Sequence, residues 1–183
     1  MKISLIHLIP SSDKKASVEK ALKLMKKSLE DNIDVVCLPE KFLYFGEIEE
    51  SQTIESKTIK EFREFANVNN VNVILGNISI LSDEKNKITN SSLIINRHGD
   101  IMHRDDEENP KIFELEGIKM VSGMCFDAKY PEDFIELIQQ GTEVIFLSSK
   151  IVLYNGKILA VMNKEEGHIT ADLSIEDLRR PIE

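Results

Sequence analysis

The chain has 183 residues, of which 42% are hydrophobic and 30% are charged. This balance is typical of a soluble globular protein and excludes a disordered chain, and the length predicts one domain over residues 1–183. Acidic residues number 32 against 23 basic ones, for a net charge of -9. Repulsion from phosphate therefore argues against nucleic acid and anionic membranes as partners.

Other features of the sequence limit its location and its cofactors. No apolar run approaches the roughly 20 residues of a membrane span, and no signal-peptide pattern is present. Cys37 and Cys125 form neither a disulfide framework nor a zinc spacing. The four histidines are scattered, so we expect no metal and no cofactor. A reduced, cytoplasmic protein is the expectation.

The first 40 residues predict a β-α-β unit. Residues 2–8 and 34–38 are buried strands, ended by Pro10 and Pro39. Between them, residues 16–29 carry apolar side chains at spacings of three and four, which indicates an amphipathic helix. A crossover helix between two strands predicts a parallel pair and an α/β fold.

The rest of the chain continues this alternation of strands and helices. We expect a helix through Phe62 ending at Asn69-Asn70, strands over 71–80 and 90–95, and a charged loop over 103–109. The runs 111–115 and 118–124 predict a hairpin that turns at Glu116-Gly117. A helix is then expected over 131–140, with Gly141 after it, and a strand over 144–147. Asn155-Gly156 predicts a hairpin. A further strand and a short helix over 175–180 are expected to follow.

Two residues stand where α/β folds place chemistry. Glu40 directly follows the buried strand VVCLP, at the carboxyl end where such folds form their sites. Cys125 follows another buried strand and precedes a helix beginning at Pro131, a geometry that presents a nucleophile and aims free N–H groups at an oxyanion. The alternatives are an ordinary solvated glutamate and an inert buried thiol. Cys37 lies mid-strand and is interpreted as core.

The segments around these residues resemble a known family. VVCLPEKF, SSLIINRHGDI, GMCFDAKYPED and GKILAVMNKEEGHITADLSIEDLRR are similar, in the same order, to blocks of the nitrilase, or carbon–nitrogen hydrolase, superfamily. The resemblance covers nearly the whole chain. It implies a four-layer αββα sandwich of two mixed sheets, a Glu-Lys-Cys site, no cofactor and a homodimer packed through helix layers.

The resemblance also implies a reaction. Glu40 and Cys125 fall on the family's base and nucleophile, so Cys125 would attack the carbon of a small amide or nitrile and Glu40 would take the thiol proton. Ammonia or an amine would leave, and water would release the acyl-enzyme.

The chain departs from the family at the lysine. The aligned stretch reads Arg104-Asp105-Asp106-Glu107, and the chain is shorter than the family after Leu147. Counting back along the expected hairpin places Lys111 opposite Ser122, about 10 Å along the strand from Cys125. Lys111 is therefore the candidate replacement, and its alternative is a solvated lysine. Lys129 takes a position usually held by arginine and is expected to pair with a carboxylate.

Two functions remain open from the sequence. One is an amide or nitrile hydrolase whose activity is weak or lost, because an oxyanion-stabilising group is missing. The other is a non-catalytic relative that binds a partner or a small ligand.

Overall fold

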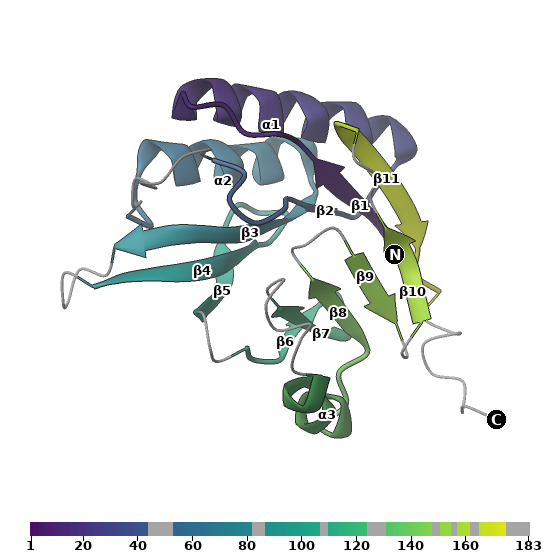
Figure 1. Cartoon of the computed structure of the whole chain (residues 1–183). Helices are drawn as coiled ribbons and strands as arrows, with labels where there is room; N and C mark the ends of the chain where they lie inside the picture. The colour runs from purple at the N-terminus through teal and green to yellow at the C-terminus, as the bar shows by residue number, and fades with distance from the viewer. Residues whose placement is uncertain are drawn as a thin grey trace.

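Two β-sheets face each other and carry helices on their outer faces (Figure 1). The computed structural model describes residues 1–43, 53–81, 87–106, 110–123, 131–147, 151–154, 157–161 and 165–174. Helices α1 and α2 cover the first sheet, and α3 covers the second. This arrangement confirms the expected αββα sandwich of two mixed sheets.

The first sheet has six strands in the order β11-β1-β2-β3-β4-β5. Its parallel part is β1–β2–β3, as the β-α-β reading predicts, and its other pairs are antiparallel. The strands are β1 Lys2–His7, β2 Val35–Cys37, β3 Asn72–Leu81, β4 Ile88–Ile95, β5 Ile101–Asp106 and β11 Gly167–Asp172.

The second sheet has five strands in the order β10-β9-β8-β7-β6. Only the β7–β8 pair is parallel, and α3 connects these two strands. The strands are β6 Phe113–Leu115, β7 Ile118–Gly123, β8 Val144–Leu147, β9 Ile151–Tyr154 and β10 Lys157–Val161. Leu115 pairs with Ile118, which confirms the register expected for the β6–β7 hairpin.

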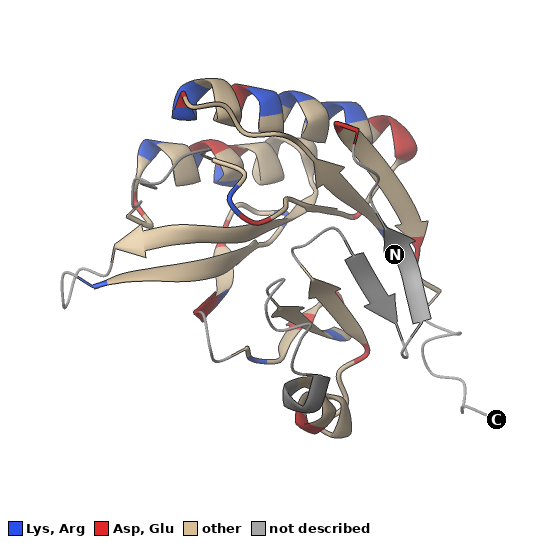
Figure 2. Ribbon diagram, viewed as in Figure 1, with Lys and Arg blue, Asp and Glu red and all other residues tan. Residues whose placement is uncertain are grey.

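Local sequence explains where the helices begin and end. Helix α1 (Lys14–Ser28) starts at Asp13, whose side chain accepts a hydrogen bond from the Lys15 N–H, and continues into the 3₁₀ turn η1 (Leu29–Asp31). Helix α2 (Lys57–Asn69) is capped by Ser56 and ends at Asn70 in the left-handed region. Helix α3 spans Pro131–Gln139. Charged residues of both signs lie along α1 and α2 (Figure 2).

Three apolar clusters separate the four layers. Ile6, Phe62 and Ile78 belong to the cluster between the first sheet and its helices. Cys37 and Ile74 belong to the cluster between the sheets, and the cluster under α3 includes Phe134. Cys37 is only 6% exposed, as its core interpretation requires. Burial raises the pKa of the Cys37 thiol, because a thiolate there would lack solvation.

One predicted element is wrong. Residues 103–106 were expected in a charged loop, yet they form the C-terminal part of β5, which pairs with β4. Pairing with β4 satisfies the backbone of this polar stretch, and His103 and Asp105 turn inward. Residues 107–109, the Asn155-Gly156 turn and the expected helix over 175–180 lie outside the described residues.

Candidate active site

The turn that carries Glu40 is hydrogen-bonded along β3. After β2 ends, the Leu38 N–H donates to the Ile74 carbonyl at 2.9 Å, and the Gly76 N–H donates to the Leu38 carbonyl at 3.1 Å. The Lys41 N–H then donates to the Asn77 carbonyl at 3.0 Å. Glu40 therefore sits on a backbone that the neighbouring strand holds on both sides.

Gly76 permits this close approach. A Cβ atom at position 76 would lie 2.4 Å from the carbonyl carbon and oxygen of Pro39 and 2.5 Å from the Leu38 oxygen. These neighbours are backbone atoms, so no side chain could enter without moving the Glu40 turn. A glycine inside a strand often marks such an approach.

The Glu40 side chain is half-buried. Lys41, directly after it, has φ of 53°, a left-handed conformation that side chains rarely adopt. Within the described part of the chain, no hydrogen bond or ion pair to the Glu40 carboxylate is found. The turn beneath the carboxylate is tightly defined.

On the facing sheet, β7 leads toward Cys125. Met120 packs between the two sheets, and Ser122, two residues later on the same face, is 4% exposed. Val121 faces α3 instead, as does Gly123, where a Cβ would lie 2.7 Å from the Phe134 ring. Cys125, like Lys129, falls within residues 124–130, outside the described part of the chain.

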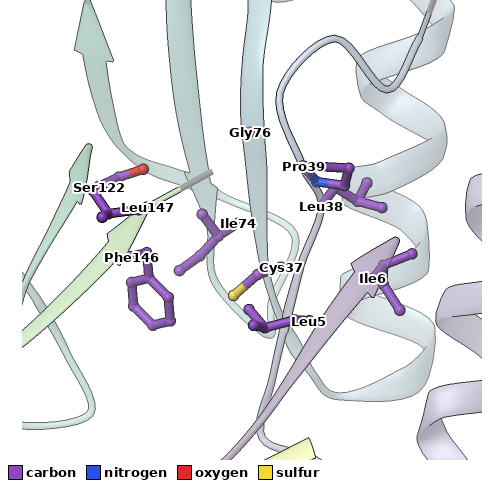
Figure 3. Close-up of a pocket in the computed structure, with 10 residues that line it drawn as sticks. All are labelled: Leu5, Ile6, Cys37, Leu38, Pro39, Ile74, Gly76, Ser122, Phe146 and Leu147. Carbon is purple, nitrogen blue, oxygen red and sulfur yellow. The ribbon is translucent and has the colours of Figure 1, made fainter. Parts of the chain in front are cut away.

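A small cavity lies between the ends of these strands (Figure 3). It offers about 20 Å³, room for about one water molecule. Pro39 from the Glu40 turn and Ser122 from β7 both border it. The full lining is Leu5, Ile6, Cys37, Leu38, Pro39, Ile74, Gly76, Ser122, Phe146 and Leu147.

Buried hydroxyl groups connect the two sheets beside this cavity. Ser122 Oγ donates to Ser92 Oγ on β4 at 3.1 Å. Ser92 Oγ donates in turn to Asn77 Oδ1 on β3 at 2.8 Å. These contacts join β7 to the strand that holds the Glu40 turn.

Asp105 places a buried carboxyl group on the face of the first sheet that also carries Ser92. Its Cα is paired with that of Ser92, and its side chain is 4% exposed. Oδ1 lies 3.0 Å from His103 Nε2 and accepts the Lys111 N–H at 2.9 Å. Oδ2 is buried without a hydrogen-bond partner among the described residues. Burial raises the pKa of Asp105, and His103 and Lys111 offset this only in part.

Lys111 adjoins Asp105 and does not lie opposite Ser122, the position that the sequence predicted. The β6–β7 ladder reaches Phe113–Met120 and stops there, so Lys111 precedes β6 and is not paired with Ser122. The residue is exposed, and its main-chain N–H is bonded to Asp105. Its ammonium group has no hydrogen bond or ion pair to any described residue.

Sequence reasoning missed the polar residues between the sheets. Ser122 follows apolar residues of β7 and Ser92 directly precedes the apolar end of β4. A serine buried in such a position must find a partner. That signal was available. No such signal was present for Asp105, because no alternation of apolar and polar residues marks the stretch around it.

Within the described ranges, no group of three or more His, Cys, Asp or Glu residues is placed to hold a metal ion. No helix in those ranges is long and apolar enough to cross a membrane.

Solved structures define the class of fold. An amidase from Nesterenkonia sp. AN1, carrying acrylamide added at its active-site cysteine, superposes with a TM-score of 0.79 at 13% identity, over 98% of this chain and 95% of the amidase. Nit3 of Saccharomyces cerevisiae, a member of the nitrilase superfamily, superposes with a TM-score of 0.81 at 19% identity, over 97% and 91% of the two chains. The fold is that of the nitrilase superfamily.

Sequence similarity then establishes the family. The profile of the carbon–nitrogen hydrolase family matches residues 2–150, so the chain belongs to this family. It is 23% identical over 191 residues to the deaminated glutathione amidase of Dictyostelium discoideum, covering 85% of this chain and 66% of the amidase. It is 22% identical over 175 residues to the Drosophila melanogaster NitFhit fusion protein, covering 80% and 38%. The chain thus spans two thirds or less of these relatives.

Proposed function

We propose that the chain is a slow hydrolase of a small amide or nitrile that works through an acyl-enzyme on Cys125. Glu40 takes the thiol proton as sulfur bonds to an amide carbon, and the leaving nitrogen receives that proton as the C–N bond breaks. Water then adds to the thioester and returns the thiol. The observation that supports this proposal is the cavity bordered by both the Glu40 turn and the end of β7.

Electrostatics supports a low rate. Addition of the thiolate builds negative charge on the substrate heteroatom, which the family meets with a lysine. Here the inter-sheet face carries the buried carboxyl of Asp105, and Lys111 is exposed. Loss of one oxyanion donor typically costs about 10² to 10³ in rate. We therefore expect turnover far below the enzyme median of about 10 per second.

A second candidate is a non-catalytic member of the fold that binds a partner or a small ligand. The missing lysine supports it, because the aligned stretch carries the buried carboxyl of Asp105 and the Lys111 side chain is exposed.

Alkylation of the two cysteines tests the proposal and separates the two candidates. Iodoacetamide at pH 7, followed by peptide mass mapping, should label Cys125 at least about tenfold faster than buried Cys37, since one pKa unit changes the thiolate fraction tenfold. Glu40→Gln should slow this labelling, and Glu114→Gln, at an exposed carboxylate on β6, should not. Equal labelling of both cysteines would contradict the hydrolase and favour the binding protein. Ammonia release from simple amides should vanish in Cys125→Ser.

We further propose that the chain works in the cytoplasm, where reducing conditions keep the Cys125 thiol free, and that it forms a homodimer. Exposed Ile135 and Ile138, three residues apart on α3, support self-association, because large apolar side chains side by side favour contact with another surface.

A further inference from the structure

Three buried polar side chains form a continuous link across the interior. Asn77, Ser92 and Ser122, here called the hydroxyl link, are 6%, 1% and 4% exposed. The bond from Ser92 to Asn77 has the ordinary length of 2.8 Å, and the bond from Ser122 to Ser92 is longer, at 3.1 Å. One apolar cluster fills much of the space between the sheets. The hydrogen bonds of the hydroxyl link need a defined geometry that apolar contacts do not.

A β-bulge creates the first half of the hydroxyl link. Leu75 pairs with Leu93 and Ile78 pairs with Ser91, so Gly76 and Asn77 together oppose Ser92. Two residues facing one turn the bulged strand and re-aim its side chains. The Asn77 side chain thereby reaches Ser92, while Gly76 leaves room for the Glu40 turn.

Both ends of the hydroxyl link lie beside residues of the proposed site. At one end, the Asn77 carbonyl accepts the Lys41 N–H, one residue after Glu40. At the other end, Ser122 is three residues before Cys125 on the strand that leads to it. The two segments come from different sheets. Among the described residues, these bonds form a hydrogen-bonded connection between them.

We propose that Ser92 and Ser122 are positioning residues that set the distance between the Glu40 turn and the end of β7, and so the reactivity of Cys125. This inference rests on the proposed roles of Glu40 and Cys125. Proton transfer from thiol to carboxylate needs a hydrogen-bond contact, so a small misplacement of either segment weakens the base. Loss of the hydroxyl link should therefore lower reactivity while the fold persists.

The pH profile of Cys125 alkylation tests this role. Ser92→Ala and Ser122→Ala should slow labelling at pH 7 by about fivefold or more and move the midpoint of the profile to higher pH, because a less well placed base leaves less thiolate. Ser122→Thr keeps the hydroxyl, and its extra methyl group has space in the adjoining cavity. We expect this variant to stay within about twofold of the wild-type rate.

Ser91→Ala is the matched control. Ser91 is also fully buried and hydrogen-bonded, but it lies next to Ser92 on the opposite face of β4, where it donates to Asp106. Removing its hydroxyl should reduce stability without moving the midpoint. A wild-type midpoint in Ser92→Ala, or an equal shift in Ser91→Ala, would overturn the proposal.

A second measurement keeps the inference separate from the proposed function. If Glu40→Gln leaves Cys125 labelling unchanged in the otherwise wild-type chain, the base role of Glu40 is wrong. The hydroxyl link is then judged by amide hydrogen exchange at Lys41, whose N–H is held by Asn77. Ser122→Ala should speed that exchange about fivefold or more, and an unchanged exchange rate would refute the link itself.

Discussion

Asp105 and Asp106 are adjacent carboxyl groups whose pKa values move in opposite directions. Burial raises the pKa of Asp105, and its Oδ2 has no hydrogen-bond partner among the described residues. Burial also acts on Asp106, but hydrogen bonds from Ser91 and Arg104 outweigh it and lower the pKa of that carboxyl. The difference follows from the strand, because successive side chains of β5 point to opposite faces of the sheet.

Exchange of each aspartate for asparagine should change stability with opposite sign. The folded state holds the Asp105 proton more tightly than the unfolded state, so stability is lost as pH rises through the unfolded and then the folded pKa. Asp105→Asn should therefore raise Tm at pH 7.5, with the gain shrinking toward pH 4. One kcal/mol corresponds to about 2–4 °C in a chain of this size. Thermal melts followed by circular dichroism at several pH values measure this.

Asp106→Asn serves as the opposing case. Its lowered pKa contributes stability that is present above the unfolded pKa and lost as pH falls through the folded pKa. The variant should melt below wild type at pH 7.5 and approach it in acid. A fall in Tm for Asp105→Asn at pH 7.5, as large as that for Asp106→Asn, would show that the Asp105 carboxylate is well solvated or paired.

At the scale of elements, the bulge in β3 supports the Glu40 turn. Gly76→Ala should destabilise the protein by about 1–3 kcal/mol, the usual range for overpacking, because the new Cβ meets backbone atoms of Pro39. The same change should slow Cys125 labelling by displacing Glu40. Chemical denaturation and the alkylation assay measure the two effects.

Gly167→Ala provides the control for this substitution. A Cβ at the start of β11 would meet nothing within 4 Å, so the change should be neutral or slightly stabilising. Equal destabilisation by both alanines would mean that the approach of Pro39 to Gly76 carries no special cost.

Sequence patterns predicted the elements whose apolar residues repeat with a clear period. The β1–α1–β2 unit and the β6–β7 register follow from such patterns and are confirmed. Strand β5 was missed because its polar residues carry no apolar period. Its pairing depends on the neighbouring strand β4 and not on its own residues. The count that set Lys111 opposite Ser122 assumed a longer ladder than the one that forms.

Only part of the candidate site was predictable from the sequence. Glu40 follows its strand as expected. Its turn is hydrogen-bonded to β3 and borders the cavity between the sheets. The role of Cys125 remains a prediction. Ser92 and Ser122 were not anticipated, because their meeting depends on how the two sheets stack, which no single strand encodes.

At the scale of the whole molecule, α3 is the surface through which we propose that two chains associate. If the homodimer forms through this helix, the wild-type chain at micromolar concentration should scatter light with twice the mass of one chain. Ile138→Glu should give the monomer, because a charge buried without a partner opposes association. Val68→Glu, at a side chain 73% exposed on α2 in the opposite outer layer, should leave the dimer intact. A monomeric wild-type chain would contradict this assembly.

The position of β11 has a consequence for how the protein forms during synthesis. Residues 2–7 pair with residues 167–172, and Met1 and Leu173 exchange backbone hydrogen bonds of 2.8 and 2.7 Å. Domains begin to form while the ribosome adds about 5–20 residues per second. Strand β1 is therefore synthesised many seconds before β11, its antiparallel neighbour. Throughout that interval one border of the first sheet is an open edge, the kind of surface on which nascent chains aggregate and which chaperones protect.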